Sequence, residues 1–135
     1  MALTGLVIDD AQVGSLNPLP VKGRNPSTVA AQIASGQSLT GAIDLADGIL
    51  ARIVMPASWT AANLTFQTSN DGASFNDLHD ENGNEVTVTA AASRAIRLSP
   101  ADWVGVRHLK LRSGTSAGAI NQAALRSLVL VTVPR

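Results

Sequence analysis

The sequence predicts an all-β protein: an antiparallel β-sandwich of the jelly-roll kind over residues 28–135, preceded by an extended N-terminal arm over residues 1–27. Three observations lead to this prediction. Short runs in which apolar and polar residues alternate follow one another from residue 28, as in half-buried strands. Turn signals separate them at roughly the 8–12-residue spacing of sandwich proteins. The chain has 135 residues, 45% hydrophobic and 15% charged, which suits one domain with its own core.

The arm differs in composition from the rest of the chain. It holds three prolines, Pro18, Pro20 and Pro26. Because proline fixes φ and donates no hydrogen bond, we expect residues 1–27 to lack regular structure and to become ordered on a partner. Two bases of the arm, Lys22 and Arg24, are candidate interface residues.

The predicted strands cover residues 28–34, 41–45, 48–56, 63–69, 75–79, 85–90, 94–99, 107–113 and 127–133. Their alternation assigns faces, so that Val86 and Val88 are expected to point inward and Thr87 and Thr89 outward. The run SLVLVTV at 127–133 is continuous and β-branched, which is typical of a buried central strand.

One stretch, SPADWVGV at 99–106, breaks the strand pattern. Ser99 is a candidate N-cap, Pro100 suits the first helical position, and Gly105 can end the element. We therefore expect one short helical turn, with Trp103 covering one end of the sandwich.

Two glycine turns, SNDGAS at 69–74 and DENGNE at 80–85, are rich in Asn and Asp. These residues favour tight turns with positive φ, so the strands at 63–69, 75–79 and 85–90 should form a meander. Phe66 and Phe75 are expected in the core. An alternative is a Ca²⁺ site whose oxygen ligands come from Asp80, Asn82 and Glu85. The EF-hand spacing is absent, and a plain hairpin turn is the favoured interpretation.

Catalytic constellations are weak. GTSAG at 114–118 matches the G-x-S-x-G pattern, but no Asp, Glu or His follows Ser116, as that class of hydrolase requires. His79 and Asp80 are neighbours in a predicted strand and should point to opposite faces. The chain has no cysteine, which excludes thiolate metal sites and a Cys nucleophile. We therefore expect neither an enzyme nor a cofactor.

Charge is neutral in total but unevenly distributed. Residues 40–90 hold seven acids and one base, whereas residues 91–135 hold seven bases and one acid. A neutral total produces little attraction to nucleic acid, so we expect oppositely charged strands or copies to pair instead. The bases expected on an outward sheet face, as candidate interface residues that meet acids of the 71–85 meander, are Arg94, Arg97, Lys110 and Arg112.

A carbohydrate-binding module is an alternative, because many such modules are β-sandwiches. Their ligand faces stack sugar rings on Trp and Tyr, and this chain has two Trp and no Tyr. Trp59 and Trp103 are the candidate ligand-facing aromatics. A capping position at the sandwich end is the favoured interpretation for both.

Residues 28–133 resemble a group of small virion proteins of tailed bacteriophages, which are β-sandwiches of the capsid decoration (cement) or head-fibre kind. The segment FQTSNDGASFNDL at 66–78 is the most recognisable part, and discoidin-like galactose-binding sandwiches share it in outline. The resemblance implies a homotrimer on the outer capsid surface that binds the major capsid protein and stabilises the head, without nucleic-acid or membrane contact. The alternative is a glycan- or receptor-binding module on a phage fibre or tail tip.

Overall fold

The computed structural model describes residues 25–135, so nearly all of the predicted arm, including Lys22 and Arg24, lies outside the described residues. The strands are β2 (Ser27–Ile33), β3 (Ile43–Asp44), β4 (Gly48–Val54), β5 (Leu64–Ser69), β6 (Asn76–Asp77), β7 (Ala95–Arg97), β8 (His108–Ser113) and β9 (Arg126–Pro134). A short 3₁₀ turn, η2 (Pro100–Trp103), precedes β8.

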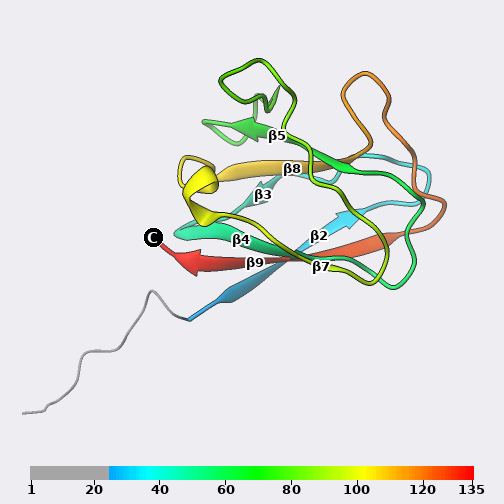
Figure 1. The fold of residues 1–135 in the computed structure, drawn as a ribbon, viewed down its shortest axis with the longest axis horizontal. Helices are drawn as coiled ribbons and strands as arrows, with labels where there is room; N and C mark the ends of the chain where they lie inside the picture. Colours follow the sequence, from blue (N-terminus) through cyan, green and yellow to red (C-terminus); the bar gives the residue numbers. More distant parts are fainter. Residues whose placement is uncertain (1–24) are drawn as a thin grey trace, which may run out of the picture.

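These strands form two four-stranded sheets, ordered β2-β9-β4-β7 and β3-β8-β5-β6, and every pairing is antiparallel. The chain passes between the sheets repeatedly, so each sheet interleaves strands from distant parts of the sequence, as in a jelly roll. Figure 1 shows the sheets as two layers, with η2 at the end where the C-terminus also lies. The predicted fold class is confirmed.

The core lies between the two sheets. Leu50, Phe66, Leu111 and Leu130 point into it and are fully buried, each adding about 1.5–3 kcal/mol to stability. Trp103 is 4% exposed, and its ring meets Phe66 edge-on, with centroids 4.9 Å apart. The expected cover over one end of the sandwich is therefore present.

The helical turn forms where the sequence predicts it, but Ser99 acts differently. Its backbone is extended, and its side chain makes no capping hydrogen bond. Instead the carbonyl of Ser99 accepts a hydrogen bond from the amide of Asp102 at 3.0 Å. Pro100, with its fixed φ, begins the turn.

The predicted strand at 85–90 is wrong as a regular strand. This segment makes only two isolated bridges, from Glu85 to His79 and from Val88 to Leu64. The segment changes partner between these positions, from the chain after β6 to β5, so no continuous ladder forms. The predicted alternation is nevertheless correct, because Val88 is buried and Val86 packs against the core.

Candidate interaction surface

The outward face of the first sheet is apolar around its central strand β9. Leu128 and Leu130 point inward and belong to the core, and the alternate residues Val129, Val131 and Val133 therefore point outward. Both faces of β9 are apolar, yet the second sheet covers only the inner one.

The strand register extends this apolar surface across the sheet. Ala30 pairs with Val129, Val129 with Val54, and Val54 with Ala95, so one whole row of the outer face is apolar. We call this surface the valine face; its members are Ala30, Val54, Ala95, Val129, Val131 and Val133.

The residues of the valine face do not belong to the core cluster, although some of them are buried. Val131 is only 6% exposed but is not a member of the core cluster, because its side chain points to the outer face of the sheet. Val54, Val129 and Val133 are half-buried. The valine face is thus contiguous but only partly exposed, and it is the candidate interaction surface of the first sheet.

Arginines border the valine face. Arg52 and Arg97 are directly opposite on β4 and β7, and both are exposed. Arg94, just before β7, is exposed too, although strand alternation alone would place it on the side of the inward Ile96. Within residues 25–135, none of these three arginines forms an ion pair. Like charges directly opposite on a sheet are destabilising, so this border suits a partner that supplies carboxylates.

The outer face of the second sheet is covered by the chain itself, so Arg112 is buried although it lies on that face. Arg112 is 7% exposed. Its Nη1 donates to Asp77 Oδ1 and its Nη2 to Glu85 Oε2, both at 2.8 Å. The side chain does point outward from β8, as alternation predicted, but the 76–85 hairpin folds over it. The predicted pairing of basic strands with meander acids is confirmed within one chain.

The third nitrogen of the Arg112 guanidinium also has an acceptor within the chain. Its Nε donates to Thr65 Oγ1 at 3.0 Å, and that hydroxyl donates to the carbonyl of Gly114 at 2.7 Å. The Arg112 guanidinium hydrogen-bonds Asp77 and lowers the pKa of that carboxyl below its usual 3.8. Arg112 thus joins Thr65 on β5 to Asp77 and Glu85, and this hydrogen-bonded cluster attaches the hairpin to the sheet.

Two further residues, Phe75 and Lys110, meet on the outer face of the second sheet. Phe75 was expected in the core, but it is only partly buried, and Lys110 Nζ lies 4.5 Å from its ring centroid. Because Lys110 alternates with the inward Leu109 and Leu111, this cation–π contact is on the outer face. Position after a turn does not determine which face an aromatic takes.

The three candidate Ca²⁺ ligands do not converge. Asp80 Oδ1 accepts hydrogen bonds from the amides of Asn82 and Asn84, both at 2.9 Å, and these bonds lower the pKa of Asp80. Glu85 is turned away toward Arg112. No group of three His, Cys, Asp or Glu side chains in residues 25–135 is arranged to hold a metal ion. Gly83, with φ of 85°, supports the hairpin interpretation.

The G-x-S-x-G match is a loop. Gly114 has φ of 92°, and a Cβ there would meet the carbonyl oxygen of Gly118 at 2.5 Å. The segment therefore turns tightly after β8 instead of joining a strand to a helix, and the amide of Ser116 donates to Glu85.

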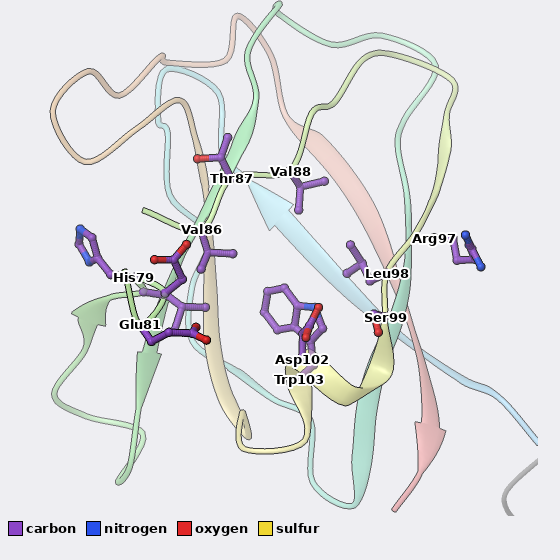
Figure 2. Close-up of a pocket in the computed structure, with 12 residues that line it drawn as sticks. His79, Glu81, Val86, Thr87, Val88, Arg97, Leu98, Ser99, Asp102 and Trp103 are labelled. Atoms are coloured by element: carbon purple, nitrogen blue, oxygen red, sulfur yellow. The ribbon is translucent and has the colours of Figure 1, made fainter. Parts of the chain in front are cut away.

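The tryptophans differ in accessibility. Trp59 packs half-buried against the core, and its Nε1 donates to the carbonyl of Ala62 at 3.0 Å. Trp103 forms the floor of a groove of about 540 Å³ between residues 78–88 and 97–103. Figure 2 shows Val86, Val88 and Leu98 around the indole. Trp103 is thus exposed only at the bottom of a groove and Trp59 is half-buried, so neither is a fully exposed ring on an open surface.

The sequence-based reasoning missed the valine face. The run at 127–133 could have indicated this face. A strand of an antiparallel sandwich that is apolar on both sides has one apolar side that the second sheet cannot cover. The described residues contain no helix long and apolar enough to cross a membrane. No family model, curated protein or solved structure matches the chain.

Proposed function

We propose that this chain is a structural virion protein of a tailed phage, which binds the outer capsid surface as a decoration protein and stabilises the head. The valine face carries this proposal. It is apolar across four strands and is bordered by Arg52 and Arg97, which form no ion pair in the described chain. Such a surface suits a protein partner that offers small apolar residues surrounded by carboxylates.

The sequence supports the major capsid protein as this partner. The resemblance to phage decoration and head-fibre proteins spans residues 28–133, which coincides with the sandwich. Jelly rolls occur in viral capsid domains and in lectins, so the fold is compatible with the proposal without deciding it. The expected homotrimer on the capsid surface is part of the same proposal.

The positions of the aromatics support capsid binding over glycan binding. Trp103 is 4% exposed, and Trp59 donates its indole N–H to the chain's own backbone. Sugar-binding faces need an exposed aromatic ring.

The test uses heads of the phage that encodes this chain, prepared without the protein. Adding the labelled full chain should saturate a fixed number of sites per head and raise the temperature at which the heads release DNA. Val129→Glu should weaken binding at least about tenfold, because it puts a charge at the centre of the valine face. Reversing both border residues, Arg52→Glu and Arg97→Glu, should weaken binding most at low salt.

Ser74→Glu is the matched control, because it adds the same charge at an exposed position remote from the first sheet. All variants should keep the circular dichroism of the parent. Unchanged occupancy of Val129→Glu on heads would contradict the proposal. Binding to a glycan array without binding to heads would favour the fibre module instead.

A further inference from the structure

The groove above Trp103 is apolar inside and acidic at its border. Leu98, Val86 and Val88 line its interior beside the indole. Its volume of about 540 Å³ lies within the range of small-ligand and peptide pockets. The groove opens between β7 and the 78–88 segment, along the edge where the two sheets separate (Figure 2).

Carboxylates dominate its rim. Asp80, Glu81 and Asp102 line the groove, against Arg97 and His79. In Figure 2 the Asp102 side chain lies by the indole, Glu81 lies across the groove on the side of His79, and Arg97 lies at the opposite margin. Glu81 and Asp102 form no ion pair within residues 25–135. The groove therefore suits an extended apolar peptide followed by bases.

The chain itself contains such a peptide. Residues 18–24 read PLPVKGR, with two prolines and two aliphatic side chains followed directly by Lys22 and Arg24. Proline-rich segments dock into aromatic-lined grooves because little conformational entropy is lost on binding. We propose that the groove binds residues 18–24 of a second copy of this chain.

Chain length limits how far Arg24 of the same chain can reach across the groove. Arg24 precedes Ser27 by three residues, so its Cα lies within about 11 Å of the start of β2. β2 and β7 are the opposite edges of the first sheet, three strand spacings or about 14 Å apart. Asp80 and Glu81 lie still farther away, beyond β7 across the groove. Arg24 of the same chain therefore falls short of them.

Binding of an arm in a neighbour's groove is a head-to-tail contact. Repeated head-to-tail contacts close into a ring when the rotation between copies permits it. The expected homotrimer would then contain one arm–groove contact per copy. Of the valine face and its border, this contact involves only Arg97. It is therefore an interaction separate from capsid binding.

The test measures the mass of the full chain in solution by sedimentation equilibrium. The parent should form a trimer. Two variants reverse the charges on either side of the contact: Lys22→Glu with Arg24→Glu in the arm, and Glu81→Lys with Asp102→Lys in the groove. Each variant alone should associate at least about tenfold more weakly, because like charges then face each other.

A chain that carries all four substitutions should recover the trimer mass, because its reversed arm then fits the reversed groove of its neighbour. Asp47→Lys is the control, an exposed acid outside the groove, and should keep the parent's mass. If a reversed variant loses its β-sheet circular dichroism, Glu81→Gln with Asp102→Asn gives a smaller weakening that serves the same purpose.

A monomeric parent, an unchanged mass in the reversed variants, or a four-substitution chain that stays monomeric would each overturn the inference. The measurement contains no capsid, so its failure would leave capsid binding by the valine face untouched. A monomeric parent would, however, also contradict the homotrimer that belongs to the proposed function.

Discussion

The two sheets share one core, but their outer faces differ in whether the chain itself covers them. On the second sheet, the 76–85 hairpin covers Arg112 and binds it through Asp77 and Glu85. On the first sheet, the valine face and the exposed pair Arg52 and Arg97 receive no such cover from the described chain. The outer residues of the second sheet therefore stabilise the fold, whereas those of the first remain available to a partner.

The largest effect should come from removing the charge beneath the hairpin. Arg112→Met keeps most of the side-chain volume but leaves Asp77 and Glu85 without their cation, and should cost about 3 kcal/mol of unfolding free energy. Arg112→Glu should cost more, because it adds a third carboxylate. Urea unfolding followed by tryptophan fluorescence measures both. A loss below about 1 kcal/mol for Arg112→Met would mean that the hairpin is held by other contacts.

The two faces of β9 provide the next comparison. Leu130→Ala removes a fully buried side chain and should cost about 3 kcal/mol. Val129→Ala, one residue away on the valine face, should cost less than about 1 kcal/mol in the free protein. The same unfolding measurement checks both. Equal losses would show that the valine face is already covered within the free chain.

The sequence was sufficient to predict the sandwich because its signals are local. Alternation in β5 and β8, the proline-led turn at η2 and the continuous β9 each depend on a few neighbouring residues. Alternation also placed Arg112 on the outer side of its strand correctly. It could not show that a hairpin more than 25 residues away in the sequence covers that side, because burial there depends on long-range packing.

The same dependence on long-range packing explains why the sequence suggested a Ca²⁺ site that the fold does not form. Asp80 and Glu85 flank one turn, and their proximity in sequence suggested shared Ca²⁺ ligation. In the fold, the Asp80 carboxylate accepts hydrogen bonds from backbone amides. The Glu85 carboxylate instead accepts a hydrogen bond from Arg112 on β8. The groove above Trp103 was likewise beyond sequence reasoning, because it forms between two segments that meet only across the edge of the sandwich.

Acid should weaken the second sheet through Asp77. Its pKa in the folded protein is lowered from 3.8 by the hydrogen bond from Arg112. The unfolded chain therefore binds the proton first as the pH falls. The stabilisation is complete above about pH 4 and is lost progressively below it. The urea midpoint should fall as the pH decreases from 4 toward 2.

Asp77→Asn should lower the midpoint at pH 6 but flatten this dependence on pH. Some slope should remain, because Asp44 and Asp71 have pKa values of about 2 in the folded protein. Asp44 owes this to Arg107, and Asp71 to the amides of Ser74 and Ala73. An identical slope in Asp77→Asn and the parent would show that the Arg112 cluster does not govern the acid response.

The smallest expected change is a gain in stability, from a substitution at the border of the valine face. Arg97→Gln removes the repulsion with Arg52 directly opposite, and should stabilise the free protein by about 0.3 kcal/mol at low salt. The gain should vanish in high salt, where exposed charges are screened. Arg94→Gln, which has no basic residue directly opposite in the register, should change stability less. If Arg97→Gln destabilises the free protein instead, Arg97 has a partner within the chain. A stabilising Arg97→Gln that binds heads more weakly would show that this pair is retained for its partner, at the expense of the fold.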